Sequence, residues 1–187
     1  MRKKLTLNNI VAWVASIFLI VAFCLTFASK YTLIGGGAVL KMPKIVWGVK
    51  TISGYANGQY EILILPDGYR VGPAIVPLIG ACLLALSAAL TIIISLAVDD
   101  TTKRKTAVGI VAIVAVIGGV LSFFVFKTGR KQMVLISDGA MTLEQLEAAI
   151  EAGAISESAG GAIATGVVAI IGGLISLISQ IVPNKQL

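Results

Sequence analysis

Residues 31–72 read YTLIGGGAVLKMPKIVWGVKTISGYANGQYEILILPDGYRVG, and the rest of the chain is organised around this segment. It is the only long stretch between apolar runs that is rich in β-branched and aromatic residues, a composition typical of strands. We therefore expect the segment from Lys30 to Gly72 to form a small antiparallel β-layer. Because long apolar runs precede and follow it, the layer is expected on the extracellular face of a four-helix transmembrane bundle.

The centre of the segment predicts a β-hairpin. Its two strands are expected at Lys44–Ile52 (KIVWGVKTI) and Gln59–Leu65 (QYEILIL). Between them, Ser53-Gly54 and Asn57-Gly58 are residues that favour turns. The run Ile62–Leu65 is apolar on both faces of such a strand, so it either is covered on both sides or presents an exposed face to a partner.

Further strands are expected on both sides of this hairpin. One is predicted near Ala38–Met42, after a flexible bend at Gly35-Gly36-Gly37. After the hairpin, Pro66-Asp67-Gly68 is expected to turn the chain back through Tyr69-Arg70-Val71. Gln132–Ser137 (QMVLIS), much later in the chain, is a short β-prone run that we expect to add a strand to the sheet of three or four antiparallel strands.

Composition places the rest of the chain in a membrane. Of the 187 residues, 57% are hydrophobic and only 13% are charged, and the mean hydropathy is +0.97. Ordinary soluble domains are about a quarter charged. The net charge of +6 does not point to nucleic acid, because the basic residues cluster beside apolar runs, as they do in membrane proteins. We therefore expect the lipid bilayer, and no nucleic acid, as a partner.

Four apolar runs are long enough to cross a bilayer, since about 20 helical residues span its hydrocarbon core. They lie at about residues 10–28, 74–98, 106–126 and 161–182 of a single integral membrane domain, 1–187. The connecting segments are an outer β-loop at 30–72, an inner loop at 99–105 and an outer strand–helix loop at 127–160. The first run exceeds the apolar part of a signal peptide, about 7–15 residues, so we expect it to be retained.

The basic residues predict the orientation. On the expected inner side they crowd into very short segments beside the spans: Arg2, Lys3, Lys4, Lys103, Arg104, Lys105 and Lys185. A similar number is spread over the much longer outer loops, although Lys127, Arg130 and Lys131 follow the third span closely. By density, the positive-inside rule favours a multi-pass protein of the cell membrane with cytoplasmic N- and C-termini.

The second outer loop predicts one short helix, Met141–Gly153. Thr142 and Gln145 form a capping box at its start, and Gly153 fits the position after its end. Three carboxylates are expected to form a solvated face rather than a cation site: Glu144, Glu147 and Glu151. Two covers for the run Ile62–Leu65 stay open, namely this helix or a neighbouring molecule that pairs sheet edges or apolar faces.

The spans predict no chemistry. Every charged residue lies outside the four apolar runs, and the chain has no histidine. Ion-coupled transporters usually carry ionisable groups within the membrane, and catalysis needs a positioned acid, base or nucleophile. Cys24 and Cys82 fall inside spans, where we expect inert packing. We therefore expect that the protein is not an enzyme and has no catalytic residue, cofactor or metal site.

Small residues in the spans predict close helix packing. In the fourth run they recur every four residues, as Gly161, Thr165, Ala169 and Gly173. Such a ladder lets helix backbones approach in lipid, either within one bundle or between two copies of the chain. An alternative set of polar side chains would line a path for a solute: Ser87, Thr91, Ser95, Ser176 and Gln180.

The layout resembles the claudin-like tetraspan architecture. That family has a long first outer loop that forms a small sheet, a short inner hairpin, and a strand after the third span that joins the sheet. Here residues 30–72 and Gln132–Ser137 occupy those places, and Trp47-Gly48 matches the start of the claudin Trp-Gly-Leu-Trp motif. Claudins also have a loop disulfide, whereas these outer loops contain no cysteine, so no claudin binding residue is carried over. The chain also resembles small four-span bacterial membrane proteins.

Together these features predict a non-enzymatic membrane protein that acts as a scaffold, an adhesion protein or a self-assembling structural component. We expect a homo-oligomer or a complex with another membrane or surface protein. The candidate interaction surface comprises Trp47, Ile62, Leu63, Ile64 and Leu65. The alternatives are a channel or transport-associated subunit, and an accessory protein that presents its sheet to a partner.

Overall fold

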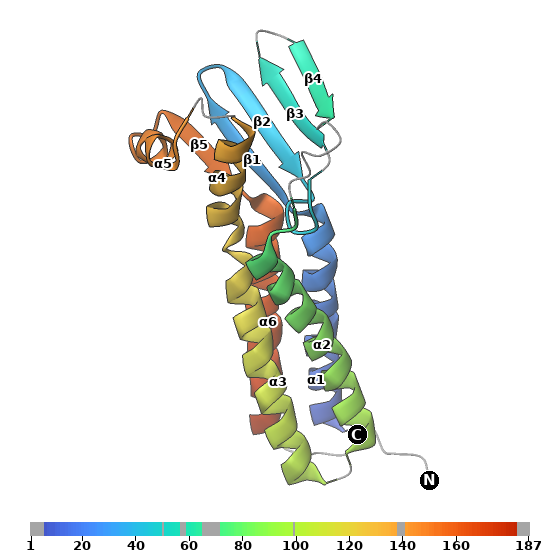
Figure 1. The fold of residues 1–187 in the computed structure, drawn as a ribbon. Helices are drawn as coiled ribbons and strands as arrows, with labels where there is room; N and C mark the ends of the chain where they lie inside the picture. The colour runs from blue at the N-terminus through green and yellow to red at the C-terminus, as the bar shows by residue number, and fades with distance from the viewer. Residues whose placement is uncertain are drawn as a thin grey trace.

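The computed structural model describes residues 6–49, 51–56, 59–64, 72–98, 100–137 and 141–182. Four long helices form an elongated bundle (Figure 1). They are α1 (Leu7–Leu25), which ends in the 3-10 turn η1 (Thr26–Ala28), α2 (Ile75–Ala97), α3 (Thr101–Ser122) and α6 (Gly160–Ile181). Each is long and apolar enough to cross a membrane. Around the bundle, α1 contacts α2, α2 contacts α3, α3 contacts α6, and α6 contacts α1.

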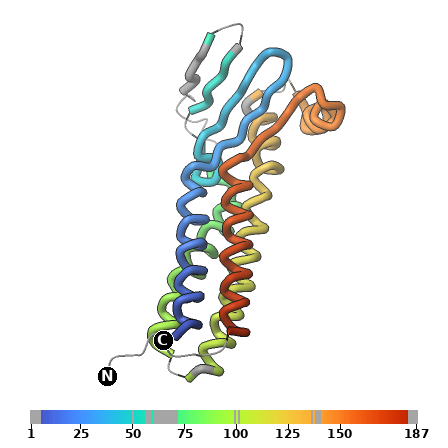
Figure 2. Tube along the Cα trace, turned by 180° about the vertical axis from the view of Figure 1, so that it is seen from behind, coloured from blue at the N-terminus to red at the C-terminus, as the bar shows by residue number. Residues whose placement is uncertain are grey.

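A small antiparallel sheet stands beyond one end of the bundle in both views (Figure 1, Figure 2). Its strands are β1 (Lys30–Gly35), β2 (Ala38–Pro43), β3 (Thr51–Ala56), β4 (Gln59–Ile64) and β5 (Ile155–Ser158). The strand order is β4-β3-β2-β1-β5, with every neighbouring pair antiparallel. The sheet therefore joins a loop that follows α1 to a strand that directly precedes α6.

Two further helices complete the sheet end: α4 (Val125–Ile136) and α5 (Leu143–Glu151). α4 follows α3 after a short break, and the two helices lie in one candidate membrane span, Thr102–Leu135, which is 34 residues long and contains an 18-residue apolar window. At about 1.5 Å per residue this stretch measures about 50 Å, well beyond a hydrocarbon core of about 30 Å. Because α4 also carries Lys127, Arg130 and Lys131, we assign the membrane-crossing part to α3. We call β1–β5, α4 and α5 the sheet layer.

One predicted strand is wrong, because Gln132–Ser137 lies at the end of α4 and just beyond it. Among the residues of this helix whose burial is described, the buried ones are Val125, Gly129, Gln132 and Met133. These residues lie four, seven and eight positions after Val125, a spacing that marks one face of a helix, and the tertiary contacts of that face override the local β propensity. The strand that joins β1 from this part of the chain is instead β5, which the sequence did not single out.

The predicted hairpin is confirmed as a pair of strands but not in its bounds. β3 pairs with β4 from Thr51 opposite Ile64 to Ala56 opposite Gln59, so Ser53-Gly54 lies within a strand and not in a turn. The segment Lys44–Trp47 is a turn, and Lys44 has a positive φ of 54°. This segment packs onto the sheet end of the bundle. Ile45 and Val46 of the segment are buried there, and so is Val49 just after it.

The glycine bend is a tight hairpin turn between β1 and β2. Gly36 and Gly37 have φ values of 58° and 77°, the backbone that a two-residue turn of the I′ type requires. The strand expected near Ala38–Met42 is confirmed as β2, whereas β1 before the bend was not predicted. The predicted turn at Pro66-Asp67-Gly68, with Tyr69-Arg70-Val71 after it, lies outside the described residues.

The predicted short helix is confirmed as α5. The Thr142 hydroxyl accepts from the Gln145 amide at 3.2 Å, and the Gln145 side chain accepts from the Thr142 amide at 2.9 Å. Gly153, two residues after the helix, has a φ of 73°. At the other end of the molecule, α3 starts earlier than expected, because the Asp100 carboxylate caps it at the Thr102 and Lys103 amides.

Candidate interaction surfaces

The small-residue ladder of α6 lies inside the bundle. A Cβ added to Gly161 would lie 2.7 Å from the carbonyl oxygen of Ala28, and one added to Gly173 would lie 2.6 Å from Val116 Cγ2. Thr165 and Ala169, between them, are buried, and Thr165 bonds its hydroxyl to the Gly161 carbonyl at 2.9 Å. This face is occupied within one chain, so it is not open to a second copy.

The polar side chains that would line a solute path also face the interior. Ser87, Thr91, Ser95 and Ser176 are buried, and the side chain of Gln180 packs against Gly109. Ser87 Oγ and Ser176 Oγ have no hydrogen-bond partner in the described part of the chain. Thr91 and Ser95 bond to carbonyls of their own helix, and Ser95 also accepts from Trp13 Nε1 at 3.0 Å.

This polar interior occupies the half of the bundle that is remote from the sheet. On the sheet side, α1 and α2 fill the interior with Leu19, Ala22, Ala81 and Leu84, all of which are fully buried. The structure thus brings the predicted polar residues together over one half of the bundle, and the side chains that α1 and α2 bury in the other half are these apolar ones.

Trp47 holds the loop after β2 against the end of α1. Its ring stacks on Phe27 with a centroid separation of 4.6 Å and an interplanar angle of 6°, and it meets Phe23 edge-on at 6.2 Å. Its indole N–H donates to Thr26 Oγ1 at 3.2 Å. The indole is half-buried in these contacts, so the structure places Trp47 at the junction of bundle and sheet layer.

Ile62, Leu63 and Ile64 lie on β4, which is an edge strand of the sheet; Leu65 lies outside the described residues. β4 pairs with β3 on one side, and no described strand pairs with its other side. α5, one of the two covers that the sequence leaves open for this run, packs on α4 and β5 at the opposite edge of the sheet (Figure 1). Within the described chain, the sheet therefore has one edge at β5, beside α5, and one open edge at β4, away from α4 and α5.

A charged cluster that the sequence did not predict binds four elements of the sheet layer together. The Tyr31 hydroxyl on β1 donates to Glu157 Oε2 on β5 at 2.7 Å. Arg130 on α4 donates to both oxygens of the same carboxylate, with its Nε 3.0 Å from Oε2. Arg130 Nη1 also lies 3.5 Å from Glu147 Oε1 on α5. We call Tyr31, Arg130, Glu147 and Glu157 the Arg130 cluster.

The surroundings of the Arg130 cluster shift its ionisation. Burial raises the pKa of Glu157, but the hydrogen bonds from Arg130 and Tyr31 outweigh it, and the net pKa lies below the usual range. Burial, followed by the hydrogen bond to Glu157, raises the pKa of Tyr31, so the phenol stays protonated. The cluster is thus a fixed ion pair with a neutral donor, an arrangement suited to holding elements together rather than to proton transfer.

Sequence patterns gave little warning of this cluster. In the sequence, Arg130 stands out only as a basic residue near the end of a span, and Glu147 only as part of a solvated helix face. Glu157 alternates with apolar and small residues in Ile155–Ser158, a weak strand signal. The described residues include no group of three or more histidine, cysteine or acidic side chains that could hold a metal, and Cys24 and Cys82 are exposed on their helices.

Fold and surfaces together define a class of protein: a bundle with four helices able to cross a membrane, joined to a small antiparallel sheet that is stabilised by a charged cluster. No protein-family model matches the chain, and no curated protein matches it.

Proposed function

We propose that this chain is a multi-pass protein of the cell membrane with cytoplasmic termini, and that it acts without catalysis as a scaffold, adhesion or self-assembling component. In this proposal the sheet layer lies outside the cell, in a claudin-like layout. The observation that carries the proposal is the open edge of β4, which stands beyond the bundle and away from α4 and α5.

An edge strand offers a partner unpaired backbone N–H and C=O groups, and another strand can add to it. Proteins that avoid such pairing shorten, bend or cover their edges. β4 spans six residues, QYEILI, which pair along their whole length with β3. Its sequence contains one charged residue, Glu61, and no proline, so it carries few of the devices that discourage pairing.

The bundle supports the same proposal by exclusion. Its small-residue faces are used up within the chain, as the contacts of Gly161 and Gly173 show. The large apolar side chains that α1, α2, α3 and α6 expose are aliphatic, of the kind that suits lipid. Assembly through the sheet layer therefore has the stronger geometric basis.

Disulfide cross-linking along β4 tests the proposal. In a background with Cys24→Ala and Cys82→Ala, single cysteines replace each β4 residue from Gln59 to Ile64 in turn, in native membranes. Two β4 edges that pair antiparallel bring one position opposite itself, so a covalent dimer is expected at one or two positions and not at their neighbours. Glu151→Cys, exposed on α5, is the matched control.

Dimers that form equally at every β4 position and at the control would contradict pairing between copies. Absence of dimers, together with an unrelated protein that cross-links to the same β4 positions, would favour the accessory role in which the sheet is presented to a partner.

A channel or transport-associated subunit is the second candidate, and the buried polar half of the bundle favours it. Ser87 Oγ and Ser176 Oγ are buried without partners in the described chain, and water is the usual partner of such groups. Conductance or solute flux in liposomes that falls when Ser176 is changed to Leu would support this role. Flux equal to that of protein-free liposomes would exclude it for the purified chain.

A further inference from the structure

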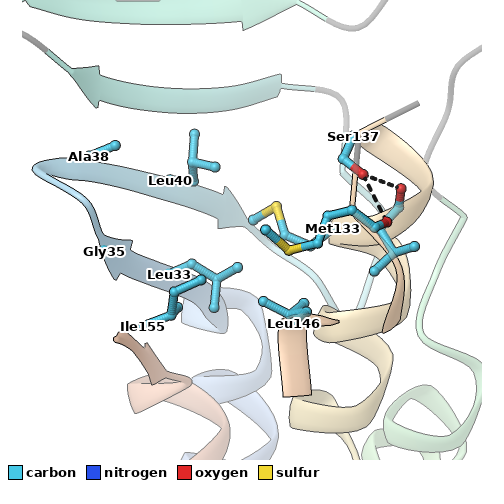
Figure 3. Close-up of a pocket in the computed structure, with 10 residues that line it drawn as sticks. Leu33, Gly35, Ala38, Leu40, Met133, Ser137, Leu146 and Ile155 are labelled. Carbon is cyan, nitrogen blue, oxygen red and sulfur yellow. Dashed lines mark hydrogen bonds between the residues drawn. The ribbon is translucent and has the colours of Figure 1, made fainter. Parts of the chain in front are cut away.

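A half-open cavity of about 400 Å³ lies between the sheet and its helices. Leu33 and Leu40 line it from β1 and β2, Met133 from α4, Leu146 from α5, and Ile155 from β5 (Figure 3). Its volume falls in the range of small-molecule sites, roughly 300–1,000 Å³. None of the described residues that line the cavity lies on β4, the edge strand on which the proposed function rests.

The walls of this cavity are almost wholly aliphatic. Among the described residues that line it, Ser137 has the only polar side chain. Its hydroxyl is already bonded to carbonyls, to Val134 O at 2.7 Å and, more weakly, to Met141 O at 3.5 Å. A buried water needs two to four polar partners, and this surface does not supply them. The chemistry of the walls therefore selects an apolar occupant.

The shape of the cavity narrows the class of occupant. Its floor is buried, with Met133 at 7% and Leu146 at 1% exposure, while its rim includes Leu40 at 41% exposure. A site with a closed apolar floor and an open rim admits a chain end-first and leaves a polar head in solvent. The described lining residues include no aromatic ring to stack on a flat ligand. The two methionines among them, Met133 and Met141, have flexible side chains that adapt to an aliphatic chain.

The place of the cavity separates it from the hydrocarbon core. Met133 on α4 follows the end of α3 at Ser122 by 11 residues, a path of about 16 Å at about 1.5 Å per helical residue. The headgroup regions add only about 5–8 Å on each side of the core. A chain bound here has therefore left the core, whether it belongs to a free single-chain amphiphile or to a lipid lifted out of the bilayer.

We propose that this cavity binds one aliphatic chain of the fatty-acyl class. The chain end contacts the floor formed by Met133 and Leu146, and the polar head lies at the rim beside Leu40. Lys131 is exposed on α4 one turn before the lining residue Val134, and its cation suits an anionic head.

Photo-cross-linking in lipid nanodiscs tests the site without competition from detergent. One arm uses hexadecanoic acid that carries a diazirine near its methyl end, and the other uses a phosphatidylcholine with the same group on one chain. The label is expected on the peptide that contains Met133 and Met141, and it should fall with excess unlabelled hexadecanoic acid. Labelling by the free acid alone identifies a free amphiphile as the source, and labelling by the phospholipid identifies the bilayer; both support the site.

Matched variants of β2 make the test specific. Ala38 lines the cavity and is only partly buried, so Ala38→Phe should fill the cavity and lower the labelling of this peptide at least tenfold. Val39→Phe places the same ring on the opposite face of the strand and should leave labelling unchanged. Should Ala38→Phe fail to fold, Met141→Glu offers a second block, because Met141 is also only partly buried. Labels confined to the spans, or insensitive to both cavity variants, would overturn the proposal.

Discussion

The bundle and the sheet layer are held together by different means. In the bundle, glycines bring backbones into contact: a Cβ on Gly80 would lie 2.7 Å from the Gly118 carbonyl oxygen. In the sheet layer, large side chains fill the core, among them Tyr31, Met42 and Leu146, and the Arg130 cluster joins four elements. Lipid offers no hydrophobic gain for helix association, so the bundle relies on close packing, whereas the sheet layer can use burial and charge.

The largest expected effect breaks the bundle side of this comparison. Gly161→Leu would place a side chain where a Cβ already meets the backbone, 2.7 Å from Ala28 O and 2.8 Å from Ser29 Cα. Backbone cannot move aside cheaply, so we expect a loss of about 3 kcal/mol, at the upper end of usual overpacking costs. The loss of stability is measured on the purified protein in mild detergent, as the fall in the temperature at which the monodisperse peak is lost on heating.

Gly160→Leu is the control for this change, because a Cβ there meets no described atom within 4 Å. It should unfold close to the temperature of the unaltered protein. Equal losses for both variants would show that the helix start, and not the contact with η1, sets the effect.

The second effect breaks the sheet layer and should spare the bundle. Arg130→Ala leaves the Glu157 carboxylate, which is only 12% exposed, without its cation. Removing one partner of a fully buried pair costs about 3–5 kcal/mol, and partial exposure of Arg130 reduces our expectation to about 2 kcal/mol. Hydrogen exchange should speed up in β5 and α5 and stay unchanged in α1, α2 and α6. Lys131→Ala, at an exposed neighbouring position, should leave exchange unaltered in every element.

How far the sequence predicted each region follows from this difference. The four apolar helices and the capping box of α5 were predicted, because bilayer thickness and local capping chemistry are read from contiguous residues. The Gln132–Ser137 run was mistaken for a strand, and β5 was missed, because both depend on contacts with residues far away in the chain. Glu157 meets Tyr31 across 126 positions and Arg130 across 27, and no local pattern encodes such pairings.

A smaller effect is expected from the Tyr31 hydroxyl, the neutral hydrogen-bond donor of the Arg130 cluster, and it can be measured apart from that of the ion pair. Tyr31→Phe keeps the ring that packs against Gly129, where an added Cβ would lie 2.5 Å from the ring, and removes only the hydroxyl. Loss of one hydrogen bond to a carboxylate that keeps its arginine should cost about 1 kcal/mol. Exchange in β5 should rise less than in Arg130→Ala. Tyr55→Phe, at a tyrosine that is 46% exposed, is the control and should change little.

The smallest expected effect is the pH dependence of the stability of the sheet layer, which is absent near neutral pH and appears on acidification. It tests whether charge or burial contributes more to the stability of this layer. Because the pKa of Glu157 is lower in the folded state than in the unfolded chain, the folded state binds fewer protons. The stabilisation is therefore complete above the unfolded pKa, near 4.5, and is lost as the pH falls through the lower folded value. Hydrogen exchange of β5 and α5, corrected for its intrinsic pH dependence, should be constant from pH 7 to about 5 and should rise below about 4.

Glu157→Gln is the control variant. It should exchange faster than the unaltered protein at pH 7 and show a flatter response to acid, because the ion pair is already absent. An acid response that is identical in both proteins would assign this response to other carboxylates, and burial of Tyr31, Met42 and Leu146 would then be the dominant support of the sheet layer.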